Sequence, residues 1–270
     1  MKIIGILNAN SDSFFEASRT PDPIEAGDRV VKMIEDGADY VDVGAVSTRP
    51  GAEKVSAEEE LHRLHPVLTQ ISTKIGFKGI YARLIVDAMH PEAVIAALNY
   101  GVRFFNLYGG IYNHEQAVML REQLCHVIVY PSHEEKWALP PMKGRLAFFR
   151  QQIEHASGVF MQKTHLILDP GIGFGLDAEG SVELAMNFWR FRSFGHPLAI
   201  GVSRKRHLGT LVATSAELPP PEARLEAGLA ETLMVVNQGA EYVRTHDVLP
   251  TWRFFTAWER LRQSKKRRPT

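Results

Sequence analysis

Polar side chains recur directly after short apolar runs along this chain. Asn8 follows the first run, Asp87 the third and Asp169 the sixth. If the runs are parallel strands, their carboxyl ends meet at one mouth, where barrel enzymes of this kind place their active sites. The sequence therefore predicts one polar pocket assembled from many strand ends. Its candidate members are Asn8, Asn10, Ser11, Asp12, Ser47, Thr48, Arg49, Asp87, Asn106, Tyr130, Ser132, His133, Asp169, Ser203, Arg204, Lys205, Arg244, His246 and Asp247.

Four basic side chains of this set are suited to an anion site: Arg49, Lys205, Arg244 and His246. Arginine can contact a phosphate through two N–H groups, and lysine supplies a compact charge. Asn8, together with serine and threonine oxygens, could join a Mg²⁺-bound phosphate, because this hard ion takes oxygen ligands and keeps several waters. The pattern indicates a phosphate or pyrophosphate group as one ligand.

Asp87, Asn106 and Asp169 bring carboxylate acceptors and an amide to the same mouth. Such a trio suits a planar heterocycle with N–H and NH₂ donors. Each acid also has a purely structural alternative. Asp169 precedes Pro170 and could only shape a turn, and Asp87 could cap a helix that begins near Pro91.

Two loops carry further signals. Residues 169–175, DPGIGFG, place three glycines at alternate positions, which permits close approach of the backbone to a ligand but does not match the GxGxxG dinucleotide fingerprint. Residues 47–51, STRPG, could form a mobile anion-binding lid. Structural alternatives are a solvated surface position for Arg204 and Arg206 and an orienting role for Asp247.

Eight short apolar runs must position these side chains. Each is nearly continuous in apolar character and bounded by turn residues, which is typical of strands buried on both faces of a parallel sheet. Successive runs begin 20 to 44 residues apart, which suits βαβ units. The runs are Ile3–Leu7, Tyr40–Val43, Leu84–Val86, Phe104–Leu107, Val127–Val129, Leu166–Leu168, Leu198–Gly201 and Tyr242–Arg244.

Helical patterns fill the intervals between the runs. Ser56 and Glu59 form a capping-box pattern, and Gly37 and Gly101 suit helix ends. The expected helices cover residues 24–35, 57–71, 91–100, 115–124, 145–155, 181–192, 222–237 and 251–262. Eight strands alternating with eight helices predict a single-domain (β/α)₈ TIM barrel over residues 1–263. A doubly wound open sheet is the alternative, because periodicity does not reveal closure. Residues 264–270, SKKRRPT, are expected to be a basic disordered tail, with nucleic-acid or lipid contact as the alternative.

Composition excludes several classes of protein. The 270 residues carry 31 basic and 31 acidic side chains, so no net positive charge drives general nucleic-acid binding. Cys125 is the single cysteine, which rules out an internal disulfide and suits a reducing cytoplasm. We expect Cys125 to be buried in the core. No run approaches 18 apolar residues, so no membrane span is expected, and the N-terminus indicates a strand rather than a signal peptide.

Several collinear motifs resemble the dihydropteroate synthase family of pterin-binding TIM barrels. They span the chain from Ile4 to about Val248, in the family's order. The matching segments are GILNANSDSF (5–14), VDVGAVSTRPGA (41–52), SAEEELHRL (56–64), IVDAMHPEAV (85–94), FFN (104–106), LDPGIGFG (168–175), GVSRK (201–205) and VRTHDV (243–248).

The resemblance implies an enzyme of folate biosynthesis that joins p-aminobenzoate to a dihydropterin pyrophosphate, with Mg²⁺ and as a homodimer. It also implies which residues would bind the pterin, the pyrophosphate and p-aminobenzoate. The pterin would be held by Asp87, Asn106, Asp169 and Lys205, and the pyrophosphate by Asn8 with Mg²⁺, Arg244, His246 and Arg49. Phe14, Thr48, Pro50 and Ser203 would line the p-aminobenzoate pocket, where sulfonamides would compete.

The chain departs from the family pattern in several loops. The usual Thr-Pro of the first loop is absent, Ala45-Val46 replaces Gly-Glu, and Tyr130-Pro131-Ser132 stands where Met-His-Met is usual. Two further interpretations follow. One is a catalytically impaired pterin-binding paralogue that acts as a binding or partner subunit. The other is a methyltransferase that uses a methylated folate.

Overall fold

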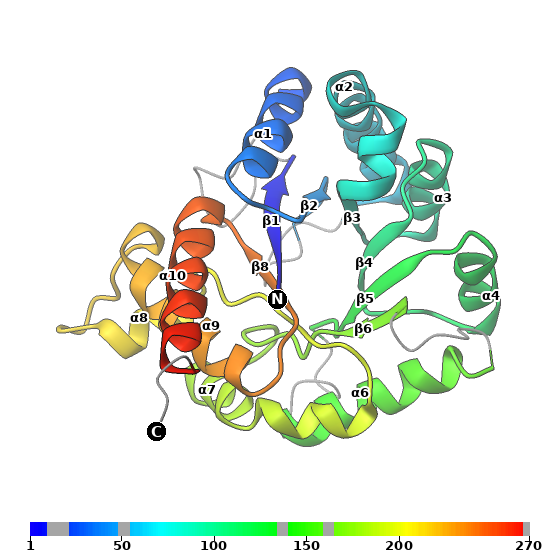
Figure 1. Cartoon of the computed structure of the whole chain (residues 1–270). Coiled ribbons are helices and arrows are strands. Elements are labelled where there is room, and N and C mark those ends of the chain that lie inside the picture. Colours follow the sequence, from blue (N-terminus) through cyan, green and yellow to red (C-terminus); the bar gives the residue numbers. More distant parts are fainter. Residues whose placement is uncertain (10–21, 48–54, 134–139, 159–164, 267–270) are drawn as a thin grey trace.

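The computed structural model describes residues 1–9, 22–47, 55–133, 140–158 and 165–266. Eight parallel strands form its centre (Figure 1), ordered β6-β5-β4-β3-β2-β1-β8-β7. A parallel bridge between Leu168 and Leu198 joins the two ends of this order, so the predicted barrel is confirmed and the open sheet is not. The strands are β1 (Lys2–Asn8), β2 (Tyr40–Gly44), β3 (Leu84–Ala88), β4 (Phe104–Tyr108), β5 (His126–Tyr130), β6 (Leu166–Leu168), β7 (Ala199–Ile200) and β8 (Tyr242–Thr245).

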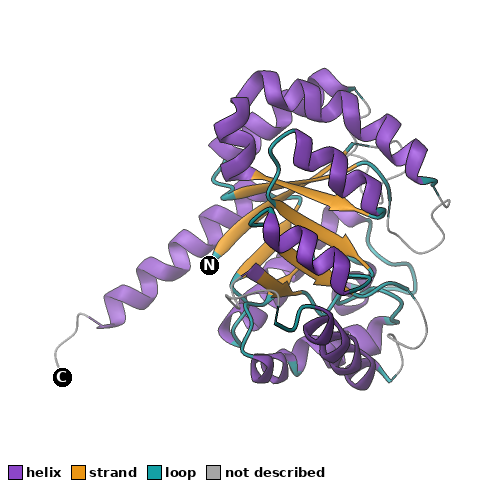
Figure 2. Cartoon of the chain, turned by 90° about the vertical axis from the view of Figure 1, so that its right-hand side faces the viewer, coloured by secondary structure: helices purple, strands orange, loops and turns teal. Residues whose placement is uncertain are grey.

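Helices surround the strands (Figures 1 and 2). Each of the eight predicted segments contains helix, and the short α8 is an addition that the periodicity did not reveal. The α-helices are α1 (Pro23–Glu35), α2 (Ala57–Arg83), α3 (Pro91–Asn99), α4 (His114–Glu122), α6 (Pro141–His155), α7 (Ala178–Met186), α8 (Arg206–Val212), α9 (Leu225–Asn237) and α10 (Val248–Lys266). Two 3₁₀ helices, η3 (Phe188–Phe194) and η4 (Pro221–Arg224), account for parts of two predicted helices.

Local signals explain most helix ends. Ser56 Oγ accepts a hydrogen bond from the Glu59 amide at 3.2 Å, which caps α2 as predicted. Gly37 and Gly101 have φ values of +105° and +93°, so each ends its helix in a conformation that glycine adopts readily. The helix α2 is longer than predicted, because it kinks at Gly76 (φ +66°) and then continues to Arg83.

The barrel interior has an apolar floor beneath a polar layer. Ile4, Ile85, Phe104, Ile128, Ile167 and Ala199 form one buried cluster. Because alternate strand residues face the interior, the inward positions two residues after Ile85, Phe104 and Ile128 belong to Asp87, Asn106 and Tyr130. A second and larger apolar core lies between the strands and the helices. These three predicted pocket residues therefore lie above a packed apolar floor.

The described part of the chain ends in α10, whose distal part extends beyond the barrel (Figure 2). The helix continues to Lys266, past the boundary that we expected at residue 264, and residues 267–270 lie outside the described part. No helix in the described part is long and apolar enough to span a membrane. Cys125 is buried as predicted, and burial raises the pKa of its thiol to about 12.

Candidate active site

A charged network occupies the upper part of the barrel. Asp42 accepts hydrogen bonds from Arg244 Nε at 2.8 Å and from Arg244 Nη2. Asn106 Nδ2 donates to the same Asp42 oxygen at 3.1 Å, and Arg244 Nη2 lies 3.5 Å from Asp87 Oδ2. Asp42 and Asn106 are essentially inaccessible to solvent. The predicted residues Arg244, Asp87 and Asn106 thus meet in one cluster, but Asp42 at its centre was missed by the sequence analysis.

The network shifts the ionisation of its members. Burial, followed by repulsion from Asp42, raises the pKa of Asp87 to about 7. Burial lowers the pKa of Arg244, but Asp42 and Asp87 more than offset this effect, so the net shift is upward and the guanidinium is always charged. One cation therefore faces two carboxylates, and the pKa of Asp87 lies near neutral pH.

Two acceptors of this cluster are unused. Among the residues that the structure describes, Asp42 Oδ1 and Asn106 Oδ1 are buried and have no hydrogen-bond partner. Buried polar atoms are nearly always hydrogen-bonded in folded proteins, and exceptions call for an explanation such as a ligand or a water. The arrangement therefore offers acceptors to a ligand that carries N–H groups.

Asp169 and Lys205 form the second part of the site. Asp169 Oδ1 accepts from the Gly171 amide at 2.8 Å, so the residue shapes its turn and is also buried in the site. The Lys205 ammonium donates to the Ile172 carbonyl and lies 4.5 Å from the centre of the Phe174 ring. Burial lowers the pKa of Lys205 to about 8 and raises the pKa of Asp169.

The glycine-rich loop at residues 169–175 lies close to the Lys205 side chain, and its close approach to a ligand stays a prediction. A Cβ on Gly173 would lie 2.9 Å from Lys205 Cδ, so a side chain at this position would displace the lysine. Arg145 of α6 holds the loop from below: its Nε donates to the Pro170 carbonyl at 2.7 Å and its Nη2 donates to Phe174. Arg145 is fully buried, and its position at the start of the predicted helix 145–155 gave no sign of this role.

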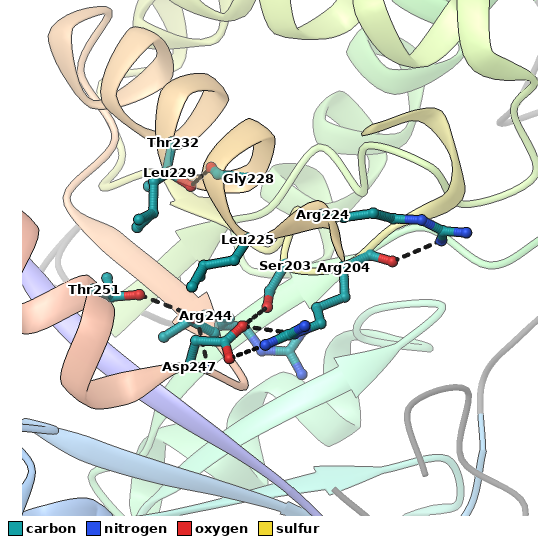
Figure 3. A pocket seen from close by; sticks show the side chains of 11 residues that line it. Ser203, Arg204, Arg224, Leu225, Gly228, Leu229, Thr232, Arg244, Asp247 and Thr251 are labelled. Atoms are coloured by element: carbon teal, nitrogen blue, oxygen red, sulfur yellow. Dashed lines mark hydrogen bonds and ion pairs between the residues drawn. The ribbon is translucent and has the colours of Figure 1, made fainter. Parts of the chain in front are cut away.

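The loops after β7 and β8 are joined by an ion pair (Figure 3). Arg204 Nε donates to Asp247 Oδ2 at 2.8 Å, and Arg204 Nη1 donates to the Pro221 carbonyl at 3.0 Å. Arg204 is 8% exposed, so its interpretation as a solvated surface charge was wrong, whereas Asp247 has the orienting role considered for it. Arg204 also has φ +62°, an uncommon backbone conformation for a residue with a side chain. The pair holds together the segments that carry Ser203 and His246.

His246 lies beside Ser203, whose Oγ is 3.2 Å from both the backbone amide and Nδ1 of His246. Burial lowers the pKa of His246 to about 4. The imidazole is therefore neutral at pH 7 and can contact a ligand as a hydrogen-bonding group rather than as a cation.

Replacing Asp247 with alanine is expected to destabilise the fold by about 3–5 kcal/mol, because it leaves the buried Arg204 guanidinium without its carboxylate. Urea unfolding followed by fluorescence would measure the loss. Asp36→Ala is the matched control: Asp36, directly after α1, pairs with the exposed Lys32, so we expect a loss of less than about 1 kcal/mol. Equal losses in the two variants would contradict a structural role for the Arg204–Asp247 pair.

The remaining predicted residues divide into two groups. Asn8 ends β1, where it pairs with Gly44 at the same mouth of the barrel. Thr48, Arg49, Pro50 and Phe14 lie outside the described residues. The described part of the chain contains no group of three or more His, Cys, Asp or Glu side chains that could hold a metal ion.

The family model, the relatives and the solved structures that this chain resembles agree with one another. A family described as pterin binding enzyme matches residues 4–246. A type-1 dihydropteroate synthase of Escherichia coli is 32% identical over 257 residues, which cover 90% of this chain and 88% of the relative. The solved dihydropteroate synthase of Xanthomonas albilineans with 4-aminobenzoic acid has a TM-score of 0.81 at 30% identity and covers 99% and 94% of the two chains. That of Yersinia pestis in a sulfonamide complex has a TM-score of 0.83 at 27% identity, with 97% and 94% covered.

Proposed function

The chain belongs to the dihydropteroate synthase family of pterin-binding enzymes, and we propose that it condenses p-aminobenzoate with 6-hydroxymethyl-7,8-dihydropterin pyrophosphate in folate biosynthesis. The products are dihydropteroate and pyrophosphate. The observation that carries the proposal is the pair of unused buried acceptors, Asp42 Oδ1 and Asn106 Oδ1, beside Asp87. A pterin presents ring N–H and NH₂ donors, which such acceptors would satisfy.

The pterin is held by four side chains in this proposal: Asp87, Asn106, Asp169 and Lys205. The carboxylates and the amide accept from the ring N–H and NH₂ groups, and the Lys205 ammonium donates to an acceptor atom of the ring. A carboxylate at Asp87 also opposes the positive charge that develops on the pterin as the leaving group departs. The same side chains therefore recognise the pterin ring and favour its reaction with p-aminobenzoate.

The pyrophosphate is assigned to Arg244 and His246, with Arg49 covering it. His246 would donate a hydrogen bond from a neutral ring, and Arg244 would contribute its charge from within the barrel. Mg²⁺ fits the donor set at Asn8, because this ion takes few protein ligands and completes its shell with waters and substrate phosphate oxygens. When bound, Mg²⁺ would neutralise charge on the leaving pyrophosphate.

p-Aminobenzoate would lie against Ser203, together with Thr48, Pro50 and Phe14, and sulfonamides would compete there. In the reaction the bond between the pterin methylene carbon and the pyrophosphate oxygen breaks, and the electron pair leaves with pyrophosphate. The arylamine nitrogen forms the new C–N bond and releases one proton. Placement of the amine within about 3–3.5 Å of this carbon is its main requirement.

The pH dependence of kcat/KM follows from two pKa values in the substrate-free enzyme. Activity is expected to rise through pH about 7 as Asp87 becomes anionic and to fall above pH about 8 as Lys205 loses its proton. His246 does not shape the pH profile near pH 7, because the pKa of its imidazole is about 4. Initial rates at limiting pterin substrate between pH 5.5 and 9.5 would measure the profile. A profile that stays flat from pH 6 to pH 9 would contradict the assigned charge states.

Growth rescue tests the function in cells. A bacterial strain that lacks its own dihydropteroate synthase should grow without folate-pathway products when it expresses this chain. The same strain expressing Lys205→Ala at equal protein level should not grow. If the wild-type chain fails to rescue although it accumulates as folded protein, the proposed activity is wrong or severely impaired.

We further propose a cytoplasmic homodimer. Support for self-association comes from exposed apolar side chains on neighbouring elements of the C-terminal half. Met186 of α7, Trp189 of η3 and Leu211 of α8 are 58%, 57% and 56% exposed. Such apolar and aromatic side chains are enriched at the centres of protein–protein interfaces.

A further inference from the structure

Tyr130 ends β5 and is 1% exposed, so its hydroxyl group needs a partner inside the barrel. The hydroxyl donates to Asp87 Oδ1 at 2.8 Å. The second oxygen of the same carboxylate, Asp87 Oδ2, lies 3.5 Å from Arg244 Nη2. Each oxygen of Asp87 thus has its own donor, on β5 and on β8. This arrangement fixes the plane of the carboxylate.

The Tyr130 ring is itself fixed on several sides. Its centre lies 5.2 Å from that of Phe174 and 5.8 Å from that of Tyr108, both in edge-to-face geometry. The Arg244 guanidinium carbon lies 5.9 Å from the Tyr130 ring centre. Aromatic pairs at these distances stabilise their relative orientation. The phenol is therefore a rigid donor, and it cannot turn away from Asp87 without disturbing these contacts.

The charged groups around Asp87 oppose one another. Burial raises its pKa most, and Asp42 on β2 and Glu60 on α2 raise it further. Arg244 on β8 and the hydrogen bond from Tyr130 lower it. Because the resulting pKa is about 7, the hydrogen bond from Tyr130 contributes to how much of the carboxylate is ionised near neutral pH.

We propose that Tyr130 is a positioning residue that orients the Asp87 carboxylate toward the pterin and stabilises its anionic form through this hydrogen bond. The inference rests on the proposed function, in which Asp87 accepts from the pterin ring. Tyr130 acts through Asp87 and takes no part in bond making or breaking.

The Tyr130→Phe variant tests the proposal, because it removes one oxygen and leaves the ring contacts in place. We expect kcat/KM for the pterin substrate to fall about fivefold at pH 7, because the loss of one hydrogen bond to a charged group raises the pKa by about one unit and lowers the anionic fraction of Asp87 from about one half to about one tenth. The acidic limb of the profile should move upward by about one pH unit, and the loss should shrink as the pH approaches 8. A residue that only stabilised the fold would leave this limb unchanged.

Tyr242→Phe is the matched control. Tyr242 begins β8 at the opposite end of the barrel, beneath the apolar floor, and its loss of a hydroxyl should leave kcat/KM and the acidic limb as in the wild type. The proposal is overturned if Tyr130→Phe keeps the wild-type acidic limb, or if both variants lose activity equally.

A readout without substrate separates this inference from the proposed function. Carboxyl ¹³C NMR of aspartate-labelled protein, with the Asp87 signal assigned from Asp87→Asn, would follow its ionisation directly. Tyr130→Phe should raise the pKa of Asp87 by about one unit whether or not the wild type turns over. An unchanged titration would overturn the role of Tyr130, whereas a shifted titration in a protein without turnover would count only against the proposed activity.

Discussion

Replacing Arg244 with methionine is expected to lower kcat/KM for dihydropteroate formation about 1000-fold and to destabilise the fold by about 3–5 kcal/mol. Arg244 is the single cation between Asp42 and Asp87 in the described structure, and its loss leaves the buried Asp42 carboxylate facing the partly buried Asp87 carboxylate. Their repulsion would raise the pKa of Asp87, which would then be largely neutral at pH 7. Steady-state rates and denaturant unfolding would measure the two effects.

A double variant separates the two effects of this substitution. Asp42→Leu combined with Arg244→Met removes both partners of the buried pair, and such replacements are often neutral for stability. We expect most of the lost stability to return and the activity to stay at the level of the single variant. If activity returned together with stability, Arg244 would be a structural residue only.

Replacing Lys205 with methionine is expected to lower kcat/KM at least about 100-fold, while the fold is retained. Lys205 is half-buried in the site, and its ammonium contacts the Ile172 carbonyl and the Phe174 ring. Its removal therefore costs little stability, but the pterin loses a charged donor. Steady-state rates would measure the loss of kcat/KM, and calorimetry would measure the loss of pterin affinity.

The Lys205→Arg variant tests whether Lys205 causes the fall in activity above pH 8. Lys205 Cδ packs against Gly173, so a longer and planar guanidinium fits poorly, and we expect only partial recovery of activity. Any remaining activity should lack the fall above pH 8, because arginine does not titrate there. A persistent alkaline limb in this variant would assign that limb to another group.

Much of the barrel could be predicted from the sequence because its strands are buried on both faces and end in polar residues. Ile85 followed by Asp87, and Phe104 followed by Asn106, show the rule: alternate residues face inward, and the last inward residue is polar. The helix α8 was missed because its seven residues, which include Gly209, carry too little periodicity.

The partners of the site residues could not be predicted in the same way. Asp42 lies within an apolar strand, and its contact with Arg244 joins positions 202 residues apart. Arg145 resembles any basic residue of a surface helix until the fold places it beneath the loop that begins at Asp169. Sequence spacing identifies which side chains reach the mouth, whereas their charge states depend on packing between distant segments.

Quantifying product is the most direct test of the central claim. Purified wild-type chain with both substrates and Mg²⁺ should form dihydropteroate and pyrophosphate in equal amounts, and neither should form when p-aminobenzoate is omitted. Calorimetry on the same preparation should show binding of a pterin. Pterin binding without any turnover would contradict the claim and identify the chain as a pterin-binding paralogue.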